Sequence, residues 1–277
     1  MARPDKFKAY AGGNVHLKKF SEILESLTGK KSAATVFDDF LKVSAISLSN
    51  IFDPENVCTS AEVKQERENL YLQIIKGYGD DAQLLTDMFA QLQLELGINK
   101  DVGYRDVLGQ LLTSMELIDK GNGQFFTPAH IAELMGELCY NDKDFAAEIK
   151  GRGYCVLREP TCGGGALVFG GVEAFKRQGF NPEERLVVIA TDLDERCVLM
   201  TYVQCAMYRI PAMVQQCNFM ENKLLSPPWY TPMFVANRWD KILASQQTLW
   251  VPNKNSPPVV EENPSVVKEE CGQISLF

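Results

Sequence analysis

A turn of three consecutive glycines constrains the fold of this chain more than any other feature of its sequence. Gly163, Gly164 and Gly165 follow a β-rich run at residues 154–157 and precede an apolar run at 166–169 that has the pattern of a helix start. Side chains at such a strand-to-helix turn would collide with a ligand that approaches the backbone closely, which favours glycine. A second β-rich run at 186–190 is again followed by a helical stretch. This alternation predicts an α/β fold with a doubly wound, parallel sheet.

Three regions with different patterns divide the chain. Residues 1–120 carry apolar side chains at helical spacing, such as Phe37, Phe40 and Leu41, and predict a helical N-terminal domain. Residues 121–250 begin with a glycine-containing break and hold the alternating strands and helices, with 212–217 and 233–236 as shorter strand candidates. Residues 251–277 are rich in proline and polar residues, and predict a disordered tail.

The overall composition excludes several classes of protein. The chain has 277 residues, of which 45% are hydrophobic, so it can fill the cores of two such domains. No apolar run is long enough to cross a bilayer and the N-terminus lacks a signal-peptide core, so we expect a cytoplasmic protein. Eight cysteines without a C-x-x-C pair and two histidines indicate buried, reduced thiols and no metal site. The net charge of −8 argues against tight autonomous binding to DNA phosphates.

Acidic residues stand at the ends of the two predicted strands. Glu159 lies just before the glycine turn, which lacks the spacing of a dinucleotide-binding fingerprint. An acidic side chain there suits the cationic amino-acid portion of S-adenosylmethionine better than a pyrophosphate. Asp192 follows the 186–190 run, where a carboxylate can accept hydrogen bonds from both ribose hydroxyls. Alternatively, Asp192 caps the next helix, a role that Asp194 can take instead.

An upstream segment completes the pattern. Gly-Gln-Phe-Phe-Thr-Pro at 123–128 precedes an apolar helical stripe, with Thr127 expected at the N-cap and Pro128 at the first helical position. The stripe contains Ile131, Leu134, Met135 and Leu138. Together with Glu-Pro-Thr-Cys-Gly-Gly-Gly at 159–165, this segment resembles the modification subunit of type I restriction systems and related N-6 adenine-specific DNA methylases. The resemblance covers about residues 36–239 and implies a helical N-terminal domain followed by a shortened, Rossmann-like methyltransferase domain.

The resemblance also implies how S-adenosylmethionine is held. The 124–128 segment would lie across its methionine end, the 159–165 loop beneath it, and Asp192 at its ribose. Asn218 and Phe219 resemble the pair that binds the adenine, although the family usually has Asp at the first position, and an amide oxygen accepts the hydrogen bond more weakly. The implied cofactor-binding residues are Gln124, Phe125, Phe126, Thr127, Pro128, Glu159, Thr161, Gly163, Gly165, Asp192, Asn218 and Phe219.

The catalytic segment of this family is Asn, Asp or Ser followed by Pro-Pro and an aromatic, and it holds a flipped base. Ser226, Pro227, Pro228 and Trp229 match it literally, but they follow Asn218 closely and only two apolar residues precede them. Asn237 follows the better strand candidate at 233–236, but the two prolines are missing there. Three interpretations stay open: catalysis by the first segment, catalysis by Asn237, or neither.

The resemblance implies an adenine-specific DNA methyltransferase that acts on the exocyclic amine. Complete family members continue with more strands and usually with a target-recognition domain, so sequence-specific methylation by this chain would need a specificity subunit. The alternative is a catalytically degenerate, S-adenosylmethionine-binding accessory or decoy protein in DNA modification or antirestriction. An intact cofactor loop beside a broken catalytic segment is consistent with that alternative.

The last five residues, Gln273, Ile274, Ser275, Leu276 and Phe277, resemble the pentapeptide with which bacterial proteins bind the replication sliding clamp. Leu276 and Phe277 can fill an apolar pocket while Gln273 hydrogen-bonds at its rim. The alternative is a chain end that only packs, or has no role. Attachment to a clamp would bring an acidic protein close to DNA without new phosphate contacts.

Overall fold

The computed structural model describes residues 14–29, 31–98, 103–115, 117, 126–139, 142–245 and 274–275. Its centre is a sheet in the order β4-β3-β2-β1-β6. Strands β1 (Cys155–Glu159), β2 (Leu186–Asp192) and β3 (Ala212–Asn218) run parallel, with Cys155 opposite Leu186 and Val188 opposite Ala212. The predictions at 154–157, 186–190 and 212–217 are therefore confirmed, and the fold is mixed α/β with a mainly parallel sheet.

Helices cover both faces of this sheet. On one face lie α9 (Ala166–Arg177) and α11 (Glu195–Met207), whose side chains share a core with Leu157 and Val188. On the other face, α12 (Pro232–Ala236) and α13 (Trp239–Ser245) pack with Val156 and Ile189. Alternate residues of β1 and β2 thus enter opposite cores, as expected for a strand buried on both faces. The short helix α10 (Pro182–Arg185) leads into β2.

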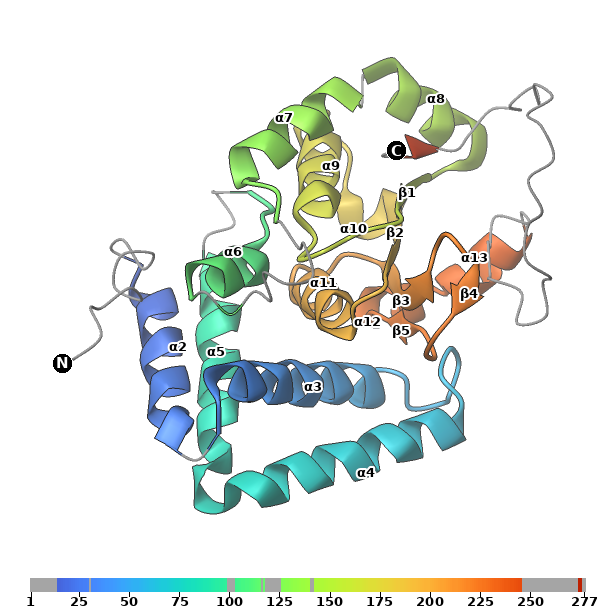
Figure 1. Ribbon diagram of the computed structural model, residues 1–277. Helices are drawn as coiled ribbons and strands as arrows, with labels where there is room; N and C mark the ends of the chain where they lie inside the picture. Colours follow the sequence, from blue (N-terminus) through green and yellow to red (C-terminus); the bar gives the residue numbers. More distant parts are fainter. Residues whose placement is uncertain are drawn as a thin grey trace.

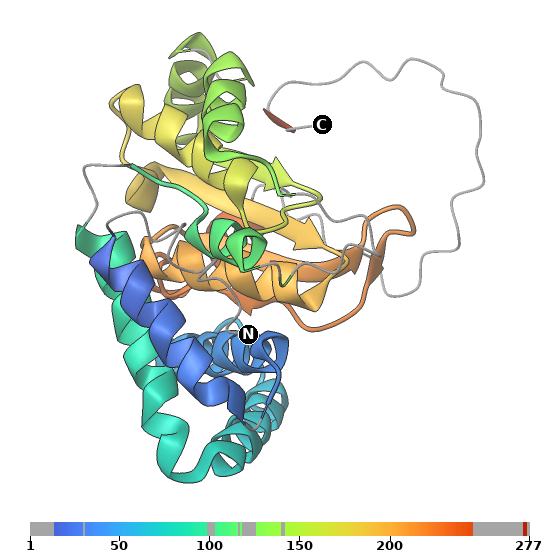
Figure 2. The same cartoon turned by 60° about the vertical axis from the view of Figure 1, so that its left-hand side comes forward.

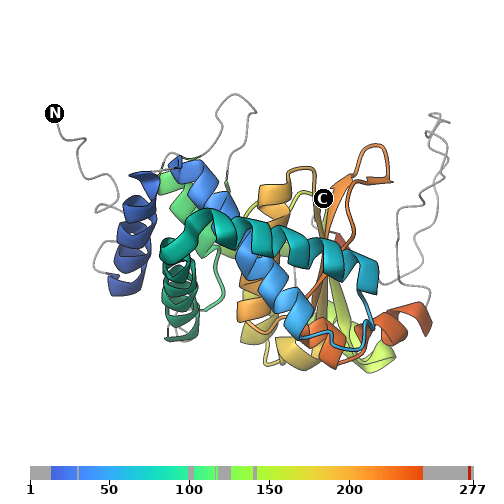
Figure 3. The ribbon, with the colours of Figure 1, turned by 90° about the horizontal axis from the view of Figure 1, so that it is seen from below.

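The N-terminal part is helical, as predicted, and lies below the sheet in Figure 1. It contains α2 (Val15–Ser26), α3 (Ala33–Ile51), α4 (Ala61–Tyr78), α5 (Ala82–Ile98) and α6 (Val107–Ser114), with single 3-10 turns at Leu27–Gly29 and Gly79–Asp81. Figure 2 shows these helices on one side of the α/β part, and Figure 3 shows α3 crossing α4. One apolar cluster runs from α2 through α3 and α5 to α11 and the sheet. The two parts therefore share a core.

At the opposite end, α7 (Ala129–Cys139) and α8 (Asp142–Arg152) lie above the sheet in Figure 1. Helix α7 packs on α9 through small residues, since a Cβ added to Gly136 would meet the Gly170 carbonyl oxygen at 2.3 Å. Most of its predicted apolar stripe faces outward: Ile131, Leu134 and Leu138 are 38%, 51% and 74% exposed. The helix is confirmed, and glycine and alanine, not the stripe, make its contact with α9.

Two predictions about irregular segments need correction. Residues 233–236, expected as a strand, form α12, because the Thr231 side chain caps the Phe234 N–H and Pro232 occupies the first turn.

The predicted disorder of 251–277 lies outside the described residues except at Ile274–Ser275. These two residues form β6, which pairs in parallel with Leu157 and Arg158 of β1. The boundaries predicted at 120 and 250 also lie outside the described residues.

The thiols in the described part of the chain are free, as predicted, and most are buried. Cys155, Cys162, Cys197, Cys205 and Cys217 are buried, whereas Cys139 is exposed. Burial raises the pKa of Cys155 to about 12, which keeps it protonated. Among the described residues, no group of three or more His, Cys, Asp or Glu side chains is placed to hold a metal ion, and no helix could span a membrane.

Candidate functional site

Three of the residues expected to bind the cofactor lie at one edge of the sheet. Glu159, Asp192 and Asn218 are the last residues of β1, β2 and β3, and these strands run in the same direction. The carboxyl edge of a parallel sheet is where α/β proteins bind ligands. The parallel topology therefore gathers side chains that are 26 to 59 positions apart in the sequence.

Backbone hydrogen bonds join the glycine turn to the end of β2. The Gly163 N–H donates to Asp192 Oδ2 at 2.8 Å, and the Cys162 N–H donates to the Thr191 carbonyl oxygen at 2.8 Å. The Asp194 N–H donates to Asp192 Oδ1 at 3.0 Å, while Asp194 itself caps α11. The interpretation in which Asp194 caps the helix is confirmed. A carboxylate has about four acceptor positions, so Asp192 can still accept a hydrogen bond from a hydroxyl group.

The three glycines of the turn have different physical roles. Gly163 has a φ of +54°, and a Cβ there would meet only the Phe126 ring, at 3.6 Å. Gly165 has a φ of +96°, and its Cβ would lie 2.7 Å from the Phe169 ring. A Cβ on Gly164 would lie 2.2 Å from Asp106 Oδ2. From the sequence we expected glycine at this turn because a ligand approaches the backbone closely. That reason applies best to Gly163, because Gly164 and Gly165 make room for other side chains of the protein.

Glu159 is the most unusual charged group of the site. It is only 1% exposed; its Oε1 accepts hydrogen bonds from the Thr161 N–H at 3.0 Å and the Thr161 hydroxyl at 3.2 Å. Its Oε2 is buried and accepts no hydrogen bond from any residue that the structure describes. Burial raises the pKa of Glu159, and the nearby Asp192 raises it further. Such an oxygen is a ready acceptor for a donor supplied by a ligand.

The described part of the 124–128 segment lies against the glycine turn. The Phe126 ring is within van der Waals distance of Gly163, and Phe126 also packs on the main core. Thr127 and Pro128 lead directly into α7, with the Pro128 carbonyl oxygen accepting from the Ala132 N–H at 3.0 Å. Gln124 and Phe125 lie outside the described residues, and their roles stay predictions.

Apolar side chains border the site beyond β2 and β3. Leu193, Phe219 and Met220 are 61%, 49% and 90% exposed, which is high for residues of this size. Asn218 Oδ1 accepts from the Glu221 N–H at 3.2 Å and so stabilises the turn that follows β3. This rim, next to Asp192, can contact an aromatic ring.

The Ser226 to Trp229 segment is covered by the helical N-terminal part. The Arg67 guanidinium lies 3.5 Å from the centre of the Trp229 ring, and it donates to the carbonyl oxygens of Pro227 at 3.3 Å and Pro228 at 3.0 Å. Trp229 is 8% exposed and also packs on Tyr202, with ring centres 5.3 Å apart. In this arrangement the indole has no open face on which a base could stack.

A small cavity of about 200 Å³ adjoins the same segment. After β3 the chain forms two short strands, β4 (Lys223–Leu224) and β5 (Trp229–Tyr230), which both pair antiparallel with β3. The cavity lies where this segment meets α3, α4 and α11. The cavity is lined by Lys42, Ile46, Val63, Glu66, Arg67, Leu70, Glu195, Leu199, Ser226, Pro227 and Trp229. Ser226 therefore borders a cavity between the helical and α/β parts.

Asn237 does not fit the catalytic alternative. It ends α12, and its Nδ2 donates to the Glu183 carbonyl oxygen at 2.9 Å. Glu183 belongs to α10, just before the amino end of β2. Asn237 consequently lies at the opposite end of the strands from Glu159 and Asp192, and the interpretation is corrected: its side chain fixes α12 to α10.

Three residues that were not selected from the sequence contact these segments. Arg67 contacts the Ser226 to Trp229 segment, and Asp106 and Gln204 contact the glycine turn. Asp106 stands before an apolar helical run, a pattern that is typical of an N-cap residue. That pattern gives no indication of a contact with the glycine turn. Gln204 is an isolated amide within the apolar face of α11, a position that requires a polar partner. Nothing in the sequence signalled that Arg67 would contact residues 160 positions away.

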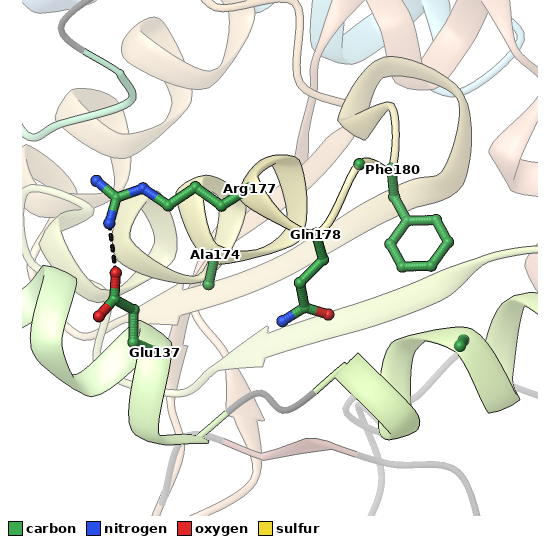
Figure 4. A pocket seen from close by; sticks show the side chains of 7 residues that line it. Glu137, Ala174, Arg177, Gln178 and Phe180 are labelled. Carbon is green, nitrogen blue, oxygen red and sulfur yellow. Dashed lines mark hydrogen bonds and ion pairs between the residues drawn. The ribbon is translucent and has the colours of Figure 1, made fainter.

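A second cavity lies away from this site. It measures about 720 Å³ and is lined by Glu137, Ala146, Ala174, Arg177, Gln178, Gly179 and Phe180. Figure 4 shows the side chains of Arg177, the last residue of α9, and of Gln178, which follows it, extending toward α7 and α8. Arg177 forms ion pairs with Glu133, Glu137 and Glu173, so its charge is already compensated. We assign the cavity no function.

No protein-family model matches the chain, and no curated protein matches it. Among solved structures, a type I restriction-modification system methyltransferase subunit from Streptococcus thermophilus is similar at a TM-score of 0.37 and 12% identity, over 77% of this chain and 62% of that one. A DrdV–DNA complex is similar at a TM-score of 0.38 and 11% identity, over 88% of this chain and 26% of that one. The chain thus spans less than two thirds of either length.

Proposed function

We propose that the carboxyl edge of β1, β2 and β3 binds S-adenosylmethionine, and that the chain is a DNA methyltransferase acting on the exocyclic amine of adenine. The observation that carries the proposal is the buried Glu159 Oε2, which accepts no hydrogen bond from the described residues and lies beside a turn whose Gly163 has only the Phe126 ring within 4 Å of an added Cβ. A cationic donor, such as the ammonium group of the cofactor, supplies what this oxygen lacks.

The remaining contacts follow from the position of each group at this edge. Asp192 would accept hydrogen bonds from the ribose hydroxyls with its free lone pairs. Phe219 and Leu193 would contact the adenine ring, and Phe126 would shield the methionine end together with the segment before it. The cofactor supplies an electrophilic methyl group, and the residues of this chain bind and orient it and exclude water. Tight binding to DNA would need a positively charged partner, because the chain has a net charge of −8 and DNA phosphates are also negative.

A second candidate function is favoured by a separate observation. Trp229 is covered by Arg67 and Tyr202, and Asn237 lies at the far end of the sheet. A protein with this arrangement would bind the cofactor without presenting a base-stacking surface. This corresponds to a catalytically degenerate accessory or decoy protein, which would act through its partners in DNA modification or antirestriction.

Calorimetry tests the cofactor proposal. S-adenosylmethionine should bind the wild-type protein, and Asp192→Ala and Glu159→Gln should each weaken binding at least tenfold, since each removes a charged acceptor. Asn237→Ala is the matched control, because it removes a side chain at the other end of the sheet. If the wild-type protein gives neither heat nor a thermal shift, the cofactor proposal fails.

Transfer of tritiated methyl groups to unmethylated DNA separates the two candidates. An enzyme should label adenine amino groups, alone or with a specificity subunit, and Ser226→Ala should reduce the label. Intact cofactor binding without label, in the presence of candidate subunits, supports the accessory protein. The cytoplasmic location remains a prediction.

We also propose that the terminal pentapeptide 273–277 binds a replication sliding clamp. Ile274 and Ser275 are the two described residues of this segment, and they are already in an extended conformation. Replacing Leu276 and Phe277 by Ala should abolish binding to a purified clamp. Equal binding by the double variant and the wild-type protein would exclude this role.

A further inference from the structure

A buried carboxylate from the N-terminal part lies against the glycine turn. Asp106 is 3% exposed and is the N-cap residue of α6. Its Oδ1 accepts from the Gly109 N–H at 2.7 Å and from Gln204 Nε2 at 3.1 Å. Its Oδ2 faces Gly164, since a Cβ built on that glycine would lie 2.2 Å from it. One carboxyl group therefore contacts α6, α11 and the turn after β1.

Gln204 of α11 completes this connection. Its side chain is fully buried, and its Nε2 donates to the Gly164 carbonyl oxygen at 2.8 Å. Its Oε1 accepts from the N–H groups of Val107 at 2.7 Å and Leu108 at 3.0 Å, which are in the first turn of α6. A single amide thus joins the start of α6 to the glycine turn.

These contacts fix the turn from its protein-facing side. The Gly164 carbonyl is held by Gln204, and the neighbouring Gly163 carbonyl accepts from the Thr201 hydroxyl at 3.0 Å. The Gly163 N–H meanwhile donates to Asp192, at the edge where the cofactor is proposed to bind. Gly164 directly follows the residue whose N–H donates to Asp192, so contacts that fix the Gly163 and Gly164 carbonyls limit the movement of that N–H. A turn fixed before the ligand arrives binds it with less loss of entropy.

We propose that Asp106 and Gln204 are positioning residues for the glycine turn, so that α6 of the helical part is a component of the cofactor site. This rests on the proposed function, because the ligand whose affinity is affected is S-adenosylmethionine. Neither residue touches the ligand in this proposal: both act through the backbone of Gly163 and Gly164.

Three variants separate positioning from helix capping. Asp106→Ser keeps an N-cap, as Ser32 and Ser60 do in α3 and α4, but is too short to reach Gln204 and Gly164. Asp106→Asn keeps the length and the acceptor. Gln204→Met keeps the volume and removes the hydrogen bonds. We expect Asp106→Ser and Gln204→Met to weaken S-adenosylmethionine binding about tenfold, and Asp106→Asn less than threefold.

Asp53→Asn is the matched control for a buried capping carboxylate. Asp53 is 1% exposed and accepts from the N–H groups of Val57, Cys58 and Thr59, so it stabilises a loop of the helical part. It makes no contact with the glycine turn among the hydrogen bonds of the described residues. Asp53→Asn should lower thermal stability while changing cofactor affinity less than twofold.

A double-mutant cycle tests the contact itself. Gly164→Ala places a methyl group against Asp106 Oδ2 in the wild-type background, so it should weaken binding about tenfold. In the Asp106→Ser background the oxygen is gone, and the added cost of Gly164→Ala should fall to about twofold. Equal costs in the two backgrounds would contradict the proposal, because a merely destabilising effect at each position would add independently.

Amide hydrogen exchange of the ligand-free protein gives a readout that does not depend on the cofactor. Asp106→Ser and Gln204→Met should speed exchange across 162–166 at least tenfold relative to Asp53→Asn, if the turn is held by these side chains. Unchanged exchange and affinity within twofold of wild type would overturn the positioning role. If no protein binds S-adenosylmethionine but the exchange differs as expected, the positioning stands and only the proposed ligand fails.

Discussion

Replacement of Asp106 by Asn should change how the stability of the protein depends on pH. Asp106 is buried, and burial raises the pKa of its carboxyl group from 3.8 to about 6, although hydrogen bonds from Gly109 and Gln204 lower it. Between pH 4 and 6 the folded protein therefore holds a proton that the unfolded chain has lost. The contribution of Asp106 to the free energy of unfolding therefore falls as pH rises through this range.

The magnitude follows from the difference between the folded and unfolded pKa. A difference of about 2 pKa units corresponds to about 3 kcal/mol on an order-of-magnitude scale. This stabilisation is fully present below pH 4, roughly half remains at pH 5, and it is absent above pH 7. An asparagine side chain cannot titrate, so Asp106→Asn should remove this contribution while keeping the acceptor for the Gly109 N–H.

Urea unfolding of the two proteins between pH 4 and 8, followed by tryptophan fluorescence, measures the effect. Burial also raises the pKa values of Glu159 and Asp192, but those groups are present in both proteins and cancel in the difference. Relative to Asp106→Asn, the wild-type protein should lose about 2 to 3 kcal/mol between pH 4 and pH 8. If the difference in the free energy of unfolding between the two proteins is the same at every pH in this range, the carboxyl group of Asp106 does not have a raised pKa.

Three further outcomes are expected. Gly165→Ala should destabilise the protein by at least about 2 kcal/mol in thermal unfolding, because of its φ of +96° and a 2.7 Å approach to Phe169, whereas Gly29→Ala, with no neighbour within 4 Å, should change little. Arg67→Ala should cost about 2 to 4 kcal/mol and increase acrylamide quenching of Trp229; unchanged quenching would mean that the guanidinium does not cover the indole. Removal of 271–277 should speed amide exchange at 157–158, which pair with β6, and equal exchange would show that this strand contributes no protection.

The two candidate functions differ in what must move. The enzyme requires that Trp229 be released from Arg67 before a base can stack on it, and Arg67 is held by Ser49 at 3.0 Å as well as by the two proline carbonyls. The accessory protein requires no such movement. Cofactor binding is common to both, so the calorimetric test comes first and the transfer assay decides between them.

Local sequence patterns were sufficient to predict the parts of the fold that depend on neighbours along the chain. The runs at 154–157 and 186–190 become β1 and β2, and Gly163 and Gly165, between β1 and α9, take the positive φ values that glycine tolerates. The cap at Asp194 could be predicted for the same reason, since its partner, the Arg196 N–H, is two residues away. The strand expected at 233–236 was wrong because the local Thr-Pro start of a helix outweighed a short apolar run.

The sequence by itself determined an α/β chain with a strand, a glycine turn, a helix and acidic residues at two strand ends. Only the tertiary structure decided which of these residues meet: it placed Asn237 at the wrong end of the sheet, Arg67 over Trp229, and Asp106 against Gly164. The physical reason is that the strand runs, the glycine turn and the caps follow from side chains that are close together in the sequence, whereas these contacts join residues about 54 to 162 positions apart. Such pairs are selected by the packing of whole elements, which no local pattern records.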